Sequence, residues 1–355
     1  MVELVFIFLL LIAVVSIPLL VVFCMAFIAQ TAAEAASNEV LPPDARNAFP
    51  VELIGHASSV PVATLAMPVA PPFIPADLSP GDTRAVDADV SGLTFRVVRS
   101  PSDLAFDVGY RALWNEFGEA HEVETRDVLE RRLTWHPANP VDGVSLLYEM
   151  IVVTKNADLS VAGVRDHTAI VGLERALPCV LVHLSHNWVA PEFRGKGLAG
   201  WMRAFPVDTA RRACRVAGLP ASTPITLVAE MEHPEAGLPD RIPRLRAYEK
   251  AGFMCVDPEQ VPYHQPDFRE PSIIDATGGA RPLPFRLILR RVGREQETHV
   301  SGAELQEIVE MLYTMYATSF RAQDVAVVRA TLARYPSGDA RIKLVKPTLG
   351  ATEAG

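Results

Sequence analysis

The sequence has little cysteine and no excess of positive charge. Its four cysteines, Cys24, Cys179, Cys214 and Cys255, form no C-x-x-C pair and have no closely spaced histidine partner. This spacing predicts neither a zinc site nor a disulfide framework, so we expect no bound metal. Acidic residues outnumber basic ones by 42 to 33, which gives a net charge of −9. Because nucleic-acid-binding domains carry clustered basic residues, we expect no nucleic-acid partner.

Positive charge is absent from the N-terminus, where Arg46 is the first basic residue. Residues 4–28 are apolar and uncharged, and about 25 such residues in a helix rise more than 30 Å, enough to cross a bilayer. We therefore expect a transmembrane helix within residues 1–30. A secretory signal cleaved between Ala32 and Ala36 is the alternative, although such signals have a basic start and a shorter apolar core.

Residues 31–90 are rich in proline, alanine, serine and aspartate. Closely spaced prolines forbid long helices and favour extended, semi-rigid chain. We therefore expect this segment to be a tether that holds a folded domain away from the membrane. No internal repeats follow it.

Beyond residue 90 the apolar periodicity predicts alternating strands and helices. Strands are expected at residues 93–100, 145–156, 160–172, 179–189, 225–231 and 281–292. Helices are expected at residues 106–120, 125–133, 198–217 and 242–253. Together they predict an α/β domain over residues 91–296. A capping box at Ser301 opens two further helices, so residues 297–355 are expected to form a helical extension that covers the domain or pairs two subunits.

The segment VAPEFRGKGLAG, residues 189–200, matches two nucleotide-binding patterns. Its glycines match the dinucleotide fingerprint G-x-G-x-x-G, whereas Arg194, Gly197 and Ala199 match R-x-x-G-x-A. A dinucleotide site needs its glycines directly after the first strand of its domain, and an acidic residue about 20 residues later. Here the segment lies in the middle of the domain, and the first carboxylate after the helix is Glu230. The sequence therefore favours the second pattern.

A second segment supports that choice. At a strand-to-helix junction, V-x-P-E-F-R-G-K-G-L-A resembles the phosphate-binding segment of the GCN5-related N-acetyltransferase superfamily, and AYEKAGF, residues 247–253, resembles the second cofactor motif of that family. The resemblance covers residues 93–292. It implies a GNAT-like mixed, mostly antiparallel central sheet flanked by helices, and acetyl-CoA as the cofactor.

The chemistry of the glycine loop fits a pyrophosphate. Glycine has no Cβ, so the backbone at Gly195 and Gly197 can approach an anion, and the amides at the start of the helix are unpaired donors. The helix dipole adds positive charge at the same end. We therefore expect the cofactor pyrophosphate to be bound by Arg194, Gly195, Lys196, Gly197, Leu198 and Ala199.

The resemblance also implies two contacts near the reacting thioester. In the family the splayed end of the preceding strand holds the pantetheine arm, which here brings the amide of Val189 against it. The tyrosine of the second motif, Tyr248, would reprotonate the departing thiolate as a general acid.

A general base is needed because the attacking amine must be neutral. Glu230, at the end of its strand and where the two central strands of this fold separate, is the first candidate. His183 and His186 are the others. Because they stand three positions apart, strand alternation predicts that they lie on opposite faces of the sheet, so that at most one faces the cleft.

The function that we expect is transfer of an acetyl group from acetyl-CoA to an amine of a small molecule or a protein by direct attack. Aromatic and acidic groups suited to an amine occur within residues 257–284, namely Tyr263, His264, Asp267 and Glu270. Because acetyl-CoA is cytosolic, we expect the domain to face the cytoplasm, anchored by the N-terminal helix. A non-catalytic CoA-binding or interaction module is the alternative, and an NAD-dependent oxidoreductase is weakened by the misplaced glycines.

Overall fold

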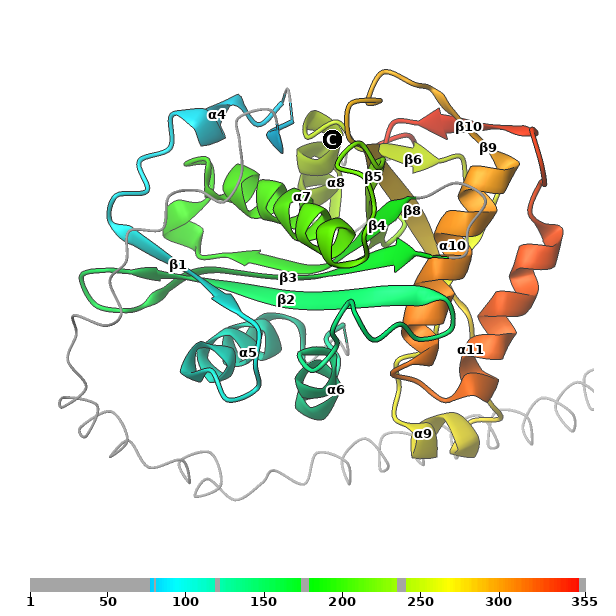
Figure 1. Ribbon diagram of the computed structural model, residues 1–355, viewed down its shortest axis with the longest axis horizontal. Helices are drawn as coiled ribbons and strands as arrows, with labels where there is room; N and C mark the ends of the chain where they lie inside the picture. The colour runs from blue at the N-terminus through cyan, green and yellow to red at the C-terminus, as the bar shows by residue number, and fades with distance from the viewer. Residues whose placement is uncertain (1–76, 80, 119–121, 174–178, 235–240, 351–355) are drawn as a thin grey trace, which may run out of the picture. The chain divides into compact units, whose positions relative to one another are not determined.

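The computed structural model (Figure 1) describes residues 77–79, 81–118, 122–173, 179–234 and 241–350. All of them belong to one compact unit of the chain. The expected transmembrane helix and most of the expected tether lie outside the described residues. Within the described ranges, no helix is long and apolar enough to span a bilayer.

A ten-stranded mixed sheet forms the centre of the fold, in the order β1-β2-β3-β4-β5-β8-β6-β10-β9, with β7 paired to β8 beside this path. The strands are β1 (Leu93–Val98), β2 (Val144–Lys155), β3 (Val161–Gly172), β4 (Val180–Val189), β5 (Ile225–Met231), β6 (Met254–Val256), β7 (Tyr263–Gln265), β8 (Leu283–Arg291), β9 (His299–Ser301) and β10 (Arg341–Val345). Between these strands β4–β5 is the parallel pair, and the other pairs are antiparallel. The expected mixed, mostly antiparallel sheet flanked by helices is confirmed.

Helices cover both faces of the sheet (Figure 1). The larger ones are α5 (Leu104–Phe117), α6 (Arg126–Arg132), α7 (Leu198–Val216), α8 (Arg241–Lys250), α10 (Gly302–Ala317) and α11 (Ala322–Arg329). Alternation along β2 separates the faces, because Leu147 packs with α7 and α8 whereas Leu146 packs with α10 and Tyr148 with α5 and α6. We call these the α7 face and the α10 face.

The ends of the long helices follow from local sequence. The Oγ of Ser301 accepts a hydrogen bond from the backbone N–H of Glu304 at 3.1 Å, so the predicted start of α10 is confirmed. Gly218 follows α7 with a φ of +72°, and the N–H of Leu219 donates to the carbonyl of Cys214. This left-handed residue ends the helix where the sequence predicted.

The C-terminal extension contains strands as well as helices. β9 and β10 join the sheet, since β10 pairs with β6 and β9 pairs with β10. The apolar stripe of α10 packs against the sheet, with Leu305, Met311 and Tyr316 fully buried. The extension therefore continues the core of the domain, which the short strands did not reveal because three to five residues are too few to show a period.

The end of the expected tether is folded. From Asp77 the chain lies against α7, and it forms the short helix α4 (Thr83–Val86). Asp82 is buried in an ion pair with Arg203 of α7, and the indole Nε1 of Trp201 donates to the carbonyl of Ala85 at 2.7 Å. These partners lie more than a hundred positions away in sequence, so the local composition did not predict them.

Candidate active site

The central strands β4 and β5 separate in the middle of the sheet. They pair only where residues 180–183 meet residues 225–228. Beyond that point β4 continues beside β3 as far as Val189, and β5 continues beside β8 as far as Met231. The ends of the two strands therefore leave a gap, as the family resemblance implied.

The backbone of β4 faces this gap at Val189. The N–H of Ala190 donates to the carbonyl of Ala162 on β3 at 3.0 Å. In an antiparallel ladder the residues that bond to the neighbouring strand alternate with residues that turn away from it. Val189 and Asn187 therefore turn their backbone groups toward the gap, and the side-chain Oδ1 of Asn187 has no hydrogen-bond partner in the described part of the chain.

The glycine loop leads from the end of β4 into α7 and presents free amides. Gly195 and Gly197 have φ values of +75° and +91°, which glycine adopts without strain. The backbone N–H groups of Gly195, Gly197, Leu198 and Ala199 have no acceptor among the described residues. The loop therefore offers unpaired donors at the positive end of a helix, as an anion site requires.

The two basic side chains of the loop differ in their contacts. The Nε of Arg194 donates to the carbonyl of Val189 at 3.0 Å. Lys196 is exposed, with its ammonium nitrogen 5.8 Å from the centre of the Phe193 ring. Arg194 thus holds the end of β4 to the loop, while Lys196 is free to reach an anion in solvent.

The N-terminal segment covers one side of the loop. A Cβ at Gly197 would lie 2.4 Å from the carbonyl oxygen of Arg84 and 2.8 Å from the Cβ of Ala88. A Cβ at Gly195 would meet no atom within 4 Å. Because Gly197 has no side chain, residues 84–88 can pack against it. A ligand can approach the loop at Gly195, where no atom would lie within 4 Å of a Cβ.

His183 and Glu230 form one hydrogen-bonded pair on the α10 face. The Nε2 of His183 lies 3.0 Å from Oε2 of Glu230, and its Nδ1 lies 3.3 Å from the Oγ of Ser185. Tyr316 of α10 donates to the same Glu230 oxygen and lies 3.2 Å from His183 Nε2. The other Glu230 oxygen accepts from Tyr263.

Glu230 is held as a carboxylate. Burial by itself would raise its pKa, but the hydrogen bonds from His183, Tyr263 and Tyr316 outweigh burial and lower the pKa below its usual value. Burial and the adjacent carboxylate raise the pKa of the Tyr316 and Tyr263 phenols well above the ordinary value, so both stay protonated donors. Because Glu230 accepts at Nε2, the neutral form of the His183 ring carries its proton on Nε2, which leaves its lone pair on Nδ1, toward Ser185.

The expectation that His183 and His186 lie on opposite faces is wrong. His183 contacts Tyr316 of α10, and His186 contacts Phe117 of α5, which covers the same face. The register between β3 and β4 shifts between Arg165 and His167. This β-bulge adds a residue to β4 and so reverses the alternation after His183.

His186 belongs to a separate buried ion pair. Its Nδ1 lies 2.9 Å from a carboxylate oxygen of Asp166, and its Nε2 lies 2.9 Å from the carbonyl of Glu122. Burial would lower the pKa of His186, but Asp166 outweighs burial and raises the pKa to about 9. Both ring nitrogens then carry protons, so His186 has no lone pair with which to act as a base.

Tyr248 lies on the other side of the sheet from this pair. It belongs to α8 and packs, half-buried, into the core on the α7 face. Its ring meets Phe253 edge-on, with 5.0 Å between centroids. No described residue forms a hydrogen bond with its hydroxyl group. Tyr248 and the His183–Glu230 pair therefore approach the sheet from opposite faces.

The residues expected to bind the acceptor have different roles in the structure. Tyr263 is part of the Glu230 cluster, whereas the carboxylate of Asp267 is occupied by Arg269 and by the N–H of Arg281. The carbonyl of His264 accepts from Tyr313 at 2.8 Å, and Glu270 is exposed ahead of α9 (Pro271–Ala276). These side chains do not converge on one pocket.

Three members of the Glu230 cluster were not predicted from the sequence, namely Ser185, Gln265 and Tyr316. Gln265 donates to Glu230 at 3.0 Å. Ser185 could have been found from its place two positions after His183 on one strand, since such residues share a face. No local signal marks Tyr316, because it stands 86 positions from Glu230.

Comparison with solved structures finds chains similar to this one. The structure is similar to GCN5-related N-acetyltransferases. One match is a mutant of the toxin AtaT, solved with the C-terminus of the antitoxin AtaR and acetyl-CoA, at 14% identity and a TM-score of 0.30 over 58% of this chain and 96% of that one. Another is a GCN5-related N-acetyltransferase from Sphaerobacter thermophilus, at 18% identity and a TM-score of 0.27 over 52% of this chain and 56% of that one. No family model matches the chain, and no curated protein matches it.

Proposed function

We propose that the protein is an acyl-CoA-dependent N-acyltransferase that transfers an acetyl group from acetyl-CoA to an amine by direct attack. The observation that carries the proposal is the gap between β4 and β5, which has unpaired amides of the glycine loop beside it and titratable groups on both faces. Acetyl-CoA supplies the activated acetyl thioester. The loop amides would bind its pyrophosphate, and the backbone of Val189 and Asn187 would bind the pantetheine arm.

The chain provides a base and an acid on opposite sides of the gap. The proton lost by the attacking amine would pass to Nδ1 of His183, directly or through the hydroxyl of Ser185. Glu230 orients the ring and stabilises the charge that it gains, in the way a carboxylate supports a catalytic histidine in other enzymes. On the α7 face, the phenol of Tyr248 would donate a proton to the departing thiolate.

Binding of the pyrophosphate by the glycine loop is tested by replacing Gly195 with alanine. Gly195→Ala should weaken acetyl-CoA binding about tenfold, because the new methyl group occupies the open side of the loop and positive φ disfavours alanine. The measurement is calorimetric titration of the full-length protein with acetyl-CoA, CoA and NAD. Gly218→Ala is the matched control, since Gly218 has φ +72° and open space but lies at the far end of α7. Equal affinities in the two variants, or binding of NAD alone, would contradict the proposed role of the glycine loop.

The acid is tested by Tyr248→Phe, which removes only the phenol. We expect kcat to fall about tenfold to 100-fold with little change in the KM for acetyl-CoA, because proton transfer to the leaving group is lost while packing against Phe253 is kept. Release of free thiol with a panel of amines measures the rate. Undiminished turnover would remove Tyr248 from this role.

We also propose where the domain lies and what it acts on. The apolar run in residues 1–30 would anchor the protein in a membrane, and the catalytic domain would face the cytoplasm, where acetyl-CoA is found. The acceptor would be an amine of a small molecule or of a protein. Acetyl-CoA binding without turnover on any amine would instead support a non-catalytic CoA-binding module.

A further inference from the structure

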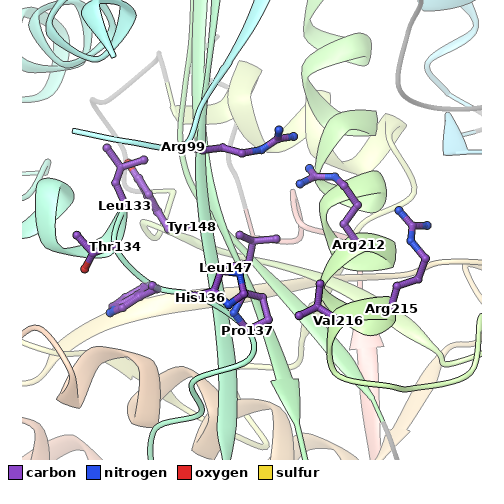
Figure 2. Close-up of a pocket in the computed structure, with 11 residues that line it drawn as sticks. Arg99, Leu133, Thr134, His136, Pro137, Leu147, Tyr148, Arg212, Arg215 and Val216 are labelled. Carbon is purple, nitrogen blue, oxygen red and sulfur yellow. The ribbon is translucent and has the colours of Figure 1, made fainter. Parts of the chain in front are cut away.

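A pocket of about 460 Å³ lies at the outer edge of β2 (Figure 2). It is separate from the candidate active site, because β3 lies between β2 and β4. Neither the glycine loop nor the Glu230 cluster contributes a lining residue. The proposed acetyl transfer therefore leaves this pocket without a role.

The pocket follows a part of β2 whose outer edge is unpaired. β1 ends at Val98, opposite Met150. The next backbone pairing on this edge joins Val141 and Val144. Between them, residues 145–149 pair with β3 on the inner side and with no described backbone on the outer side. An unpaired edge presents N–H and C=O groups that can accept another strand.

The two walls of the pocket differ in chemistry. In Figure 2, Arg212, Arg215 and Val216 project from α7 on one side of the strands, and Leu133 lies on the other side. Leu133 packs with Tyr148 in the core of the α10 face. Successive side chains of a strand point to opposite faces. A strand added beside β2 would therefore direct alternate side chains to the arginines and to the apolar wall.

The wall formed by α7 is positively charged. Arg99 and Arg212 both bind Glu149, whose side chain is 1% exposed, and Arg212 also binds Asp208 at 2.8 Å. Burial would raise the pKa of Glu149, but Arg212 and Arg99 lower it to about 2, so the carboxylate stays ionised and fixes both guanidinium groups. Arg215 is exposed and forms no ion pair with any described residue. The three arginines outnumber these two carboxylates, and no carboxylate lines the pocket, so the charge of Arg215 favours an acidic ligand.

We propose that this edge of β2 binds an extended peptide segment of a partner protein, in which acidic side chains that face the α7 wall at Arg215 alternate with apolar side chains that face Leu133. The backbone of the segment pairs with residues 145–149 of β2. Three features together favour such a peptide, namely the open strand edge, the cationic wall and the apolar wall. A compact anion would contact only the cationic wall.

The proposal is tested by fluorescence anisotropy with the full-length protein and labelled hexapeptides. The probe alternates glutamate and valine. One control peptide has lysine in place of glutamate, and a second carries N-methyl groups on the amides that would pair with β2. We expect the glutamate–valine peptide to bind at least about tenfold more tightly than either control, because one control reverses the charge and the other removes the backbone donors.

Two protein variants distinguish binding at this pocket from a general effect of the protein's net charge. Arg215→Glu should weaken binding of the probe about fivefold to tenfold, since it replaces an attraction with a repulsion at an exposed position. Arg111→Glu makes the same change at an exposed arginine of α5 and should leave binding unchanged. Acetyl-CoA binding, measured in parallel, should be unaffected in both variants.

Three results would overturn the proposal. The N-methylated peptide binding as tightly as the probe would show that no strand pairing occurs. Displacement of the probe by inorganic phosphate or free glutamate at equal concentration would make the pocket a small-anion site. No binding of the glutamate–valine peptide at millimolar concentration would leave the edge without the proposed partner, whether or not acetyl-CoA binds.

Discussion

Replacing His183 with glutamine should lower kcat for acetyl transfer by about 100-fold to 1000-fold, while acetyl-CoA binding stays nearly unchanged. Glutamine can still donate a hydrogen bond to Glu230, so the contacts that involve Tyr316 and Glu230 can persist. It has no nitrogen lone pair that can take a proton. The loss is therefore expected in the chemical step.

The measurement is the rate of thiol release at saturating acetyl-CoA with one amine. Tyr316→Phe is the comparison, because it removes one donor from Glu230 and leaves His183 in place, and we expect a loss of no more than about tenfold. Wild-type turnover in His183→Gln would show that another group accepts the proton.

Replacing Asp166 with asparagine should reduce the free energy of unfolding by about 3–5 kcal/mol near pH 6, because it leaves a buried charged histidine without its counter-ion. Asp166 is fully buried and accepts from the backbone N–H and Nδ1 of His186 and from the hydroxyl of Tyr148 at 3.0 Å. These bonds hold the β4 bulge to β3 and β2. The variant therefore disturbs the strand that carries His183.

The same ion pair gives the stability a defined pH dependence. The pKa of His186 is raised from 6.5 to about 9 in the folded protein. Its contribution to stability is therefore complete below pH 6.5 and is lost as the pH rises through about 9, a loss of roughly 3 kcal/mol. Urea unfolding followed by tryptophan fluorescence at pH 6, 8 and 10 should show this decline in the wild type and a flatter profile in Asp166→Asn.

Asp127→Asn is the control for this prediction. Asp127 pairs with Arg131 at 2.6 Å, but its side chain is 65% exposed, and such surface pairs contribute less than about 1 kcal/mol. Its removal should change neither the free energy of unfolding by more than this amount nor the pH dependence above pH 6.5. A similar small effect for Asp166→Asn would show that the buried pair is not a main source of stability.

Much of the secondary structure followed from the sequence. The strand predicted at residues 225–231 matches β5, and the helix predicted at residues 198–217 matches α7 within one residue at its C-terminal end. Both have a clear apolar period, and α7 has a glycine at each end. The short strands β6, β7, β9 and β10 were missed. Each has three to five residues, and each is held mainly by pairing with strands distant in sequence.

Of the candidate site, too, one part could be predicted from the sequence and another could not. The glycine loop could be predicted because a helix start and its free amides depend on a few consecutive residues. Glu230 could be placed at the end of its strand for the same reason. The partners of Glu230 could not, because Tyr263 and Tyr316 reach it from 33 and 86 positions away.

By itself, the sequence determined the elements with strong periodicity and the loop whose glycines permit left-handed backbone, since both arise from interactions between near neighbours. Only the tertiary structure decided that a bulge brings His183 and His186 to one face, that residues 84–88 cover Gly197, and that β1 ends early enough to leave an edge of β2 open. Each of these depends on the register of one segment against another. A shift of one residue between paired strands reverses which side chains face the core, and a local pattern cannot specify such a shift.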